Sequence, residues 1–357
     1  MAPRYSTPRE LVEALQQRGD GGRAQLHEIL HAPIDRLMEA MRGRYRLHHK
    51  QETLTRNALH AAETYLRTRP VSLFASLDWP AFRAAVLLHL AKLASQPPGH
   101  QFVERSRPEQ MPRSLCYASE IYSLPYERVG DSWFSGDWLG GREAADGSLW
   151  ILVADITGHG YHAYLLASTL PGVWQRCWEM APAAPADLLA AMHDLLEDCL
   201  PDGVYVECTL ARLHPDGEVV VAPAGGSRLL LRRGRQETPV LLKMRGAWLG
   251  LIRPSASDQQ TWTLADGDEL LLASDGLFDQ LHEHSPIDVV QRLGRIAGGA
   301  SLFERMRALL QQSLQHTEQQ DDITMVLVRR HGQVAEAAAT GPRGDLSSPN
   351  GTADVSV

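Results

Sequence analysis

Cysteine is scarce in this chain, and no two of the four cysteines have Cys-x-x-Cys spacing. They are Cys116, Cys177, Cys199 and Cys208. This distribution argues against a zinc site or a disulfide framework and favours reduced, buried thiols. The sequence also lacks an apolar run of about 18 residues, the length that a membrane span requires. Because its first residues do not lead into the apolar core of a signal peptide, we expect a cytoplasmic protein without a membrane partner.

The chain also has no excess of basic residues over acidic ones. The net charge is −8, which argues against general nucleic-acid binding. The charge is uneven, because residues 1–70 carry 12 Lys and Arg against 8 Asp and Glu, whereas the remainder is acidic. An acidic part suits a cation site, and a basic front end suits an acidic partner, although such asymmetry also arises by chance. A chain of 357 residues is expected to hold about two domains.

Residues 1–95 predict a bundle of helices, because apolar residues recur at intervals of three and four. Thr7-Pro8 is typical of a helix start, and a turn is expected at 19–22. The helices are expected around Leu11, across 26–41, across 52–67 and from Trp79 onward. Short polar turns between them favour a small helical bundle. We interpret it as a regulatory bundle of unknown ligand, and a sensory or homodimerisation role stays open.

Residues 96–114 contain several prolines and alternating charges, which indicate a linker. From 115 to 330 the pattern predicts strands, a hairpin turn at Pro215-Asp216-Gly217 and helices that arrive in pairs. This order favours an α+β fold of mainly antiparallel sheets covered by helices. The expected strands are 117–123, 129–134, 149–154, 204–213, 219–224, 228–233, 270–274 and 323–329, and the expected helices are 161–180, 185–200, 286–297 and 301–316. Residues 331–357 are expected to form a disordered tail.

Four carboxylates stand next to strand-like segments. Asp155 begins Asp-Ile-Thr-Gly-His-Gly after an apolar run, Asp137 lies in Ser-Gly-Asp-Trp, Asp275 in Ala-Ser-Asp-Gly, and Asp321 in Gln-Asp-Asp-Ile-Thr. Each one alone is typical of a turn or a helix cap. None has a neighbouring Lys or Arg, so the four would repel one another if the fold gathered them. Their convergence would therefore require a cation.

Oxygen ligands without His or Cys at metal spacing favour Mg²⁺ or Mn²⁺ over Zn²⁺. Two such ions can share a water molecule and lower its pKa, so that hydroxide forms near neutral pH. They can also hold the phosphoryl oxygens during in-line attack. The carboxylates are thus suited to the hydrolysis of a phosphate ester.

The motifs carry a family resemblance. Their order is Gly-Asp, Ala-Asp-Ile-Thr-Gly-His-Gly, Ala-Gly-Gly, Ser-Asp-Gly and Asp-Asp-Ile-Thr. Over roughly residues 115–330 this order resembles the SpoIIE-like branch of the metal-dependent protein phosphatases, the protein phosphatase 2C superfamily. The resemblance implies two sheets packed face to face between helices, an α-β-β-α sandwich that binds two Mg²⁺ or Mn²⁺ ions. Asp155 would bridge the ions and the Ile156 carbonyl would add a ligand, Asp137 and Asp275 would hold one side, and Asp321 the other.

The resemblance also implies an activity: a serine/threonine phosphatase that uses Asp137 and Asp155 in catalysis and forms no phosphoenzyme. Its relatives act on phosphorylated anti-sigma-factor antagonists in partner-switching pathways. Two positions depart from the family pattern. Thr157 stands where eukaryotic relatives have a histidine, so His159 is given no acid role, and Gly226 stands where relatives commonly have another histidine.

Further expectations concern Asp322, the absence of a phosphate-binding arginine, and the alternatives to an active enzyme. Asp322 directly follows Asp321 and is expected to point away from the metal site, because adjacent strand residues alternate between the two faces. No phosphate-binding arginine is evident near Asp137, since Arg142 is the nearest. The alternatives to an active phosphatase are a catalytically weak scaffold and a sigma-factor mimic. The mimic would bind an anti-sigma factor or RNA polymerase through the bundle, because 58–82 faintly resembles the core-binding region of sigma factors.

Overall fold

The computed structural model describes residues 5–17, 20–45, 50–95, 114, 116–124, 135–234, 238–281, 286–296 and 301–331. The helices are α1 (Pro8–Gln16), α2 (Asp20–Tyr45), α3 (Gln51–Thr68), α4 (Trp79–Ser95), α5 (Tyr161–Ala167), α6 (Leu170–Trp178), α7 (Pro185–Leu196), α8 (Asp275–Gln280), α9 (Pro286–Arg295) and α10 (Leu302–Leu314). The strands are β1 (Tyr117–Leu124), β2 (Asp137–Glu143), β3 (Leu149–Ile156), β4 (Val206–Leu213), β5 (Glu218–Ala224), β6 (Arg228–Arg232), β7 (Val240–Lys243), β8 (Gln260–Thr263), β9 (Glu269–Ala273) and β10 (Ile323–Arg330).

The N-terminal helices α1 to α4 form at the predicted positions. The first begins with a capping box, in which the Thr7 hydroxyl accepts a hydrogen bond from the backbone N–H of Glu10 at 3.2 Å. The second begins at Asp20, within the predicted turn, and continues through Pro33. Apolar side chains on the facing sides of α1 to α4 are buried in one cluster, including Leu15, Leu30 and Leu66. The apolar residues that recur every three or four positions in the sequence are therefore the ones buried between these helices.

Two five-stranded antiparallel sheets follow, in the strand orders β1-β10-β9-β6-β7 and β2-β3-β4-β5-β8. Alternate residues of each strand point to opposite faces. On β3, Ile151 and Val153 are buried against residues of the other sheet, such as Leu272 and Val326. This cluster between the sheets is the central core of the sandwich, as predicted.

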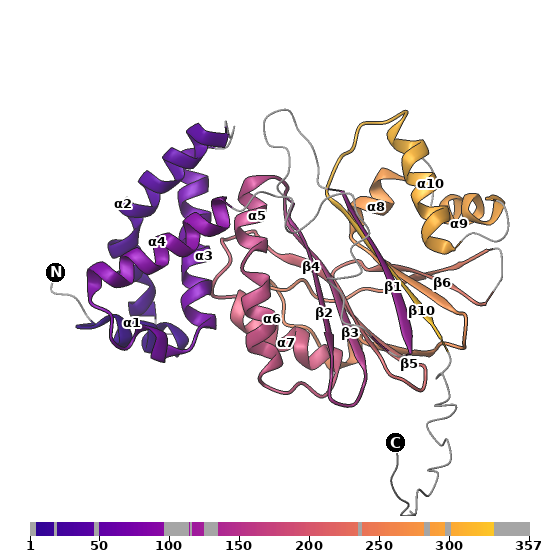
Figure 1. Ribbon diagram of the computed structural model, residues 1–357, viewed down its shortest axis with the longest axis horizontal. Coiled ribbons are helices and arrows are strands. Elements are labelled where there is room, and N and C mark those ends of the chain that lie inside the picture. The colour runs from indigo at the N-terminus through magenta and orange to yellow at the C-terminus, as the bar shows by residue number, and fades with distance from the viewer. Residues whose placement is uncertain are drawn as a thin grey trace, which may run out of the picture.

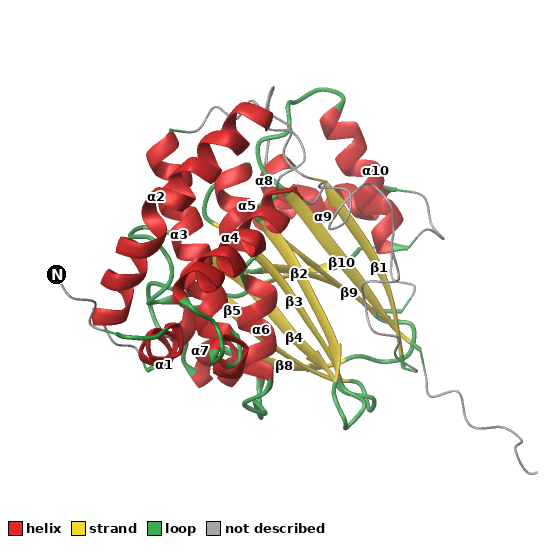
Figure 2. Cartoon of the chain, turned by 60° about the vertical axis from the view of Figure 1, so that its left-hand side comes forward, coloured by secondary structure: helices red, strands yellow, loops and turns green. Residues whose placement is uncertain are grey.

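Helices cover both outer faces of the sandwich (Figure 2). On one side Leu152 and Ala154 of β3 pack with residues of α6 and α7, such as Val173 and Leu189. On the other side Leu271 of β9 packs in a cluster to which α8, α9 and α10 all contribute. The fold is therefore the expected α-β-β-α sandwich with helices in front of it in the chain.

The helix α5 lies between α3 and the sheet that contains β2 and β3 (Figure 1). Its residues Tyr161, Tyr164 and Leu165 belong to the same buried cluster as the core of α1 to α4. The Asn57 side chain on α3 also donates a hydrogen bond to the His162 carbonyl on α5 at 3.3 Å. The N-terminal helices and α5 thus share one apolar core.

Several elements differ from those predicted. The single helix expected across 161–180 is two helices, α5 and α6, with Pro171 at the start of the second. The strands β2, β7 and β8 and the helix α8 were not predicted. The strand expected at 129–134 lies outside the described residues, as do almost all of the linker and the tail from 332 onward. Within the described ranges, no helix combines the length and apolar character needed to cross a membrane.

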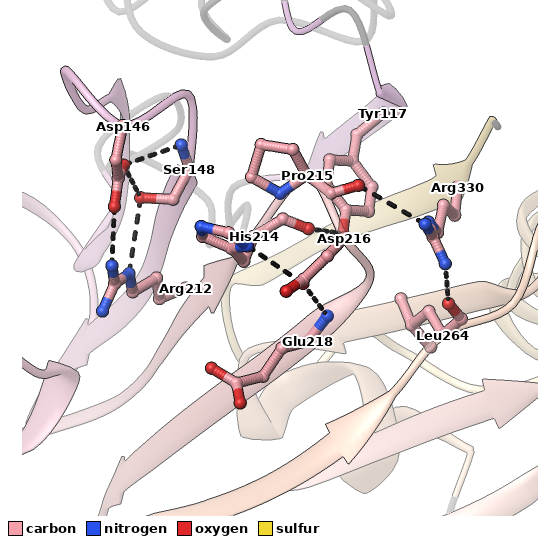
Figure 3. Close-up of polar contacts among 10 residues, drawn as sticks. All are labelled: Tyr117, Asp146, Ser148, Arg212, His214, Pro215, Asp216, Glu218, Leu264 and Arg330. Carbon is pink, nitrogen blue, oxygen red and sulfur yellow. Dashed lines mark hydrogen bonds and ion pairs between the residues drawn. The ribbon is translucent and has the colours of Figure 1, made fainter. Parts of the chain in front are cut away.

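Polar contacts hold the loops at the end of the sandwich where β3 begins (Figure 3). The predicted hairpin turn forms there, because the backbone N–H of Gly217 donates to the His214 carbonyl at 2.9 Å. The Tyr117 hydroxyl donates to the same carbonyl at 2.5 Å. Arg212 forms an ion pair with Asp146 at 2.6 Å. At this end of the sandwich Asp146 is paired with an arginine, in contrast to the other end of β3, where Asp155 has no such partner among the described residues.

Candidate metal centre

Asp137 and Asp155 face each other across two neighbouring strands. Asp137 is the first residue of β2, Asp155 is the penultimate residue of β3, and the two are direct partners in the antiparallel register. Asp155 has the same parity as Ile151 and Val153, which point between the sheets. Both carboxylates therefore lie at the inner edge of the sandwich, where the sheet that contains β9 and β10 can reach them.

Ser274 joins Asp137 to the other sheet. Its hydroxyl donates a hydrogen bond to Asp137 Oδ2 at 2.8 Å and accepts one from the backbone N–H of Thr324 at 2.9 Å. Ser274 directly follows β9 and Thr324 lies in β10, which are paired strands. This link fixes the position of Asp137 relative to the ends of β9 and β10, where Asp275 and Asp321 lie.

Asp322 also points into this region, contrary to the sequence prediction. Its side chain is 1% exposed, and Oδ2 accepts a hydrogen bond from the backbone N–H of Gly136 at 2.8 Å. Asp322 lies an even number of residues from Thr324, Val326 and Val328, so all four side chains point to the same face of the sheet. Val326 and Val328 show that this face meets the other sheet. The expectation that Asp322 turns away was therefore wrong, and this carboxylate joins the two sheets.

Asp275 opens α8 immediately after Ser274. The following residue must be glycine, because a Cβ on Gly276 would lie 2.1 Å from the Asp322 carbonyl oxygen. This close approach holds the Asp-Gly turn against the Asp321-Asp322 segment. The Ser-Asp-Gly and Asp-Asp-Ile-Thr motifs, which are far apart in sequence, are consequently neighbours.

The charges of the predicted aspartates act on one another, and burial acts on all four. Burial, followed by the charges of Asp322 and Asp275, holds the pKa of Asp137 well above its usual range. Burial and the neighbouring aspartates likewise hold the pKa of Asp155 well above its usual range. For Asp275, burial and then the charges of Glu207 and other carboxylates raise the pKa to about 6. Burial also raises the pKa of Asp321.

These carboxylates are not neutralised by basic side chains. Within the described residues, no Lys or Arg forms an ion pair with Asp137, Asp155, Asp275 or Asp321. In addition, the Oδ1 atoms of Asp137 and Asp155 are buried without a hydrogen-bond partner. Buried carboxylate oxygens without a partner are costly unless a cation compensates them. The donor set therefore fits a hard divalent cation.

Among the described residues, no three His, Cys, Asp or Glu side chains lie close enough together to enclose a metal ion by themselves. Mg²⁺ usually keeps several water ligands, so carboxylates can hold it partly through water. The Ile156 carbonyl lies next to β2, since a Cβ on Gly136 would be 3.1 Å from its oxygen. Its backbone N–H donates to the Gly136 carbonyl at 3.3 Å. Ile156 is thus held at the same edge as Asp137 and Asp155.

Glu207 is a residue of this region that the sequence did not reveal. It is the register partner of Asp155 on β4, and its Oε2 accepts a hydrogen bond from Trp248 Nε1 at 3.2 Å. A small pocket is lined by Asp155, Glu207, Gly226, Ser227, Arg228 and Asp275, among others. Arg228 forms an ion pair with Asp279 at 3.1 Å. The pocket therefore contains one arginine close to the carboxylates.

Other predicted positions have clear locations. His159 lies in the turn before α5, where it partly offsets the burial that raises the pKa of Asp321. Arg142 contacts Gln175 at 2.9 Å and stacks over Trp178, on the outer face of the sheet. The four cysteines are free and buried, as expected, and burial raises the pKa of Cys177 and Cys199 to about 12.

With this geometry in place, the chain can be compared with known proteins. The family model for Stage II sporulation protein E (SpoIIE) matches residues 145–331, more than half of the sequence. The chain therefore belongs to the SpoIIE family, and its sandwich has the PP2C-type phosphatase fold. Asp155, Ile156, Asp275 and Asp321 lie within the match, whereas Asp137 precedes it. A comparison with curated protein sequences gives no significant match.

Solved structures support the fold. The RsbU and RsbW domains of a Mycobacterium tuberculosis protein align at 22% identity and a TM-score of 0.54, over 62% of this chain and 64% of that one. The SiaA PP2C domain of Pseudomonas aeruginosa aligns at 22% identity and a TM-score of 0.50, over 59% of this chain and 85% of that one. The PP2C phosphatase domain of Bacillus subtilis SpoIIE with a regulatory fragment aligns at 18% identity and a TM-score of 0.50, over 60% and 62%. The match thus spans less than two thirds of the first and third of these chains.

Proposed function

We propose that this protein is a metal-dependent serine/threonine protein phosphatase that hydrolyses a phosphoprotein directly, without a phosphoenzyme. One observation carries the proposal. Among the described residues, no Lys or Arg forms an ion pair with Asp137, Asp155, Asp275 or Asp321, and the buried Oδ1 atoms of the first two are unpaired. Such a cluster of mutually repelling groups has no benefit for folding. It is suited to holding cations, and membership of the SpoIIE family agrees with that role.

The residues would hold two Mg²⁺ or Mn²⁺ ions as follows. Asp155 would lie between the two positions, Asp137 and Asp275 would hold one, Asp321 would hold the other, and the Ile156 carbonyl would add a ligand. When bound there, such ions activate water and stabilise charge on a phosphoryl group. The hydrogen bond from Ser274 orients Asp137, and Asp322 orients the Gly136 backbone that precedes it.

Arg228 is the candidate for orienting the phosphate. It lines the pocket beside Asp275, and its guanidinium is well suited to phosphate oxygens. Its ion pair with Asp279 is partly exposed, so a phosphate can compete for the arginine at small cost. Gly226 keeps the pocket floor free of a side chain at the position where relatives have a histidine.

For the substrate we propose a phosphorylated anti-sigma-factor antagonist of a partner-switching pathway, as the family resemblance implies. The N-terminal helices are then the part suited to an anti-sigma or sigma-pathway partner. A phosphatase-like scaffold without turnover is the rival proposal. It leaves the retained carboxylates without a purpose, because a docking protein gains nothing from buried charges that destabilise it.

The test measures phosphate release from a phosphoserine protein by the full-length chain, with Mn²⁺ or Mg²⁺ and with chelator. We expect turnover only with metal, and a loss of at least about 100-fold in Asp155→Asn and in Asp275→Asn, more than the loss typical of residues that act behind the ligands. Asp202→Asn is the matched control, because Asp202 is exposed in the loop before β4. Metal-independent turnover, or full activity in Asp155→Asn, would overturn the proposal.

A further inference from the structure

Three exposed apolar side chains stand together in the part of the chain between β7 and β8. Trp248, Leu251 and Ile252 fall within five positions of one another, and their exposed fractions are 39%, 47% and 57%. Single exposed apolar residues are normal on a protein surface, but a contiguous group of them marks a surface that contacts something else. We call these three side chains the apolar patch.

A tight turn holds the apolar patch together. The backbone N–H groups of Leu251 and Ile252 both donate to the Trp248 carbonyl, at 3.2 and 3.0 Å. Gly250 lies in this turn with a φ of 88°, which favours glycine. Its N–H donates to His193 Nδ1 at 3.1 Å and so fastens the turn to α7. The three side chains are therefore exposed on an anchored turn.

The loop that carries the patch is also fastened beside the candidate metal centre. Leu249 exchanges two backbone hydrogen bonds with Val206 at the start of β4, at 3.0 and 3.1 Å. Gly246 exchanges two more with Gly225, which follows β5, at 2.9 and 3.2 Å. The next residue, Gly226, lines the pocket of the centre. The loop is thus tied to the two strands whose ends form one side of that pocket.

Glu207 connects the patch to the pocket directly. It lines the pocket together with Asp155 and Asp275, and its Oε2 accepts the hydrogen bond from Trp248 Nε1 at 3.2 Å. The indole ring of Trp248 also contacts the ring of Tyr205, with 5.6 Å between the ring centroids. One side chain therefore separates the exposed indole from the space between the carboxylates.

This position decides what can cover the patch. A phosphoryl group that reaches Asp155 and Asp275 brings the residues on either side of its serine or threonine onto the surface around the pocket. An extended chain advances about 3.3 Å per residue, so these neighbours come within reach of Trp248. An apolar neighbour would be buried against the indole and the two aliphatic side chains, which favours binding. A small phosphate ester would leave the patch exposed.

We propose that the apolar patch binds an apolar side chain of the phosphoprotein substrate, within about three residues of the phosphorylated serine or threonine. The inference rests on the proposed phosphatase function and narrows its substrates to phosphoproteins with an apolar residue beside the phosphorylation site. The patch lies beside the reacting atoms without touching them. It therefore acts on substrate binding, and hence on KM more than on kcat.

The experiment measures kcat and KM of the full-length protein with Mn²⁺ for a series of phosphoserine peptides. The parent peptide has glutamine at the three positions on each side of the phosphoserine, and each other member replaces one glutamine by leucine. We expect at least one leucine position to raise kcat/KM by about tenfold, mainly through KM, which is the discrimination that an apolar contact can supply. p-Nitrophenyl phosphate, which has no flanking residues, reports on the centre alone.

Variants locate the preference for leucine, measured as the ratio of kcat/KM for the best leucine peptide and the parent. This ratio does not depend on the active fraction of a preparation. Leu251→Ser and Ile252→Ser should each lower it by at least about threefold, and both leave the Trp248–Glu207 hydrogen bond in place. Val240→Ser is the matched control and should keep the ratio, because Val240 is 52% exposed on β7, outside the patch.

The outcomes separate this inference from the function on which it rests. If metal supports no turnover of p-nitrophenyl phosphate or of any peptide, the proposed phosphatase function fails, and the role of the patch fails with it. If all these substrates are hydrolysed but leucine brings no advantage at any position, the patch does not bind substrate and the phosphatase function stands. The same conclusion holds if Leu251→Ser and Ile252→Ser both keep the wild-type ratio.

Discussion

Replacing Asp275 by asparagine should stabilise the metal-free protein. Burial and neighbouring carboxylates raise the pKa of Asp275 from 3.8 to about 6. A shift of about two units corresponds to a penalty of about 3 kcal/mol at pH 7, where the carboxylate is ionised in both folded and unfolded states. Asparagine removes this penalty but also the favourable charge in the first turn of α8, which is worth up to about 1 kcal/mol. We therefore expect a net gain of about 2 kcal/mol in the free energy of unfolding.

The sign of the effect depends on pH and on metal. Because the folded state holds the proton more tightly, the penalty is absent below the unfolded pKa of 3.8, grows as the pH rises from 3.8 to about 6, and is fully present above that pH. The difference between the two proteins should thus vanish near pH 4. With excess Mg²⁺ or Mn²⁺ it should reverse, since a cation that binds only the folded wild type at 100 times its dissociation constant adds about 2.7 kcal/mol.

The assay is urea unfolding of both proteins at pH 4 and pH 7, with chelator and with metal. Asp202→Asn controls for the loss of one charge at an exposed position. The reasoning fails if Asp275→Asn is less stable than the wild type in chelator at pH 7. It also fails if the difference between them is the same at both pH values, because then repulsion between carboxylates is not its source.

Three further substitutions test the packing around the centre and the bundle by the same unfolding assay. Gly276→Ala should cost about 1–3 kcal/mol, because the alanine Cβ would clash with the Asp322 carbonyl oxygen. Gly226→Ala should stay within about 0.5 kcal/mol, because the nearest atom to an added Cβ is Glu207 Oε1 at 3.7 Å; equal costs would contradict the close approach at Gly276. Glu63→Gln should cost about 3 kcal/mol, because this fully buried carboxylate pairs with two arginines at 2.9 Å. Glu13→Gln should cost less than about 1 kcal/mol, because Glu13 is partly exposed and its partner Arg9 is exposed; a neutral Glu63→Gln would refute the buried pair. Leu165→Ala should cost about 2–5 kcal/mol, and a cost below 1 kcal/mol would show that α5 does not belong to the bundle core.

The sequence predicted the layers and the four aspartates because both depend on local patterns. The continuous apolar run before Asp155 indicated the buried strand β3. Asp155 lies at the end of that strand, Asp275 follows a strand and Asp321 precedes one, and these strand ends can be read from composition. Asp137 was found by its motif, although the strand was expected before it rather than after it. Helical spacing marked α1 to α4 for the same local reason.

Features that depend on strand pairing were missed. Glu207 joins the centre only because β4 pairs with β3 in the register that sets it opposite Asp155, and no local pattern encodes that register. Asp322 was assigned to the wrong face because the alternation was counted from Asp321. Counting back from the buried Val326 and Val328 gives the correct parity, but it requires knowing which face of β10 meets the other sheet.

The position of α5 decides how the N-terminal helices relate to the candidate metal centre. Its side chains Tyr161, Tyr164 and Leu165 are packed in the core of the bundle, while its first residue follows the Asp155 turn by only a few positions. Close-packed cores do not deform smoothly, so a rearrangement of α3 must move α5 or open a cavity between them. A truncation that removes residues 1–95 would expose two tyrosines and a leucine next to the centre. Full-length point variants are therefore the sound way to separate regulation from catalysis, because a truncated protein would change both the packing of α5 and the bundle at once.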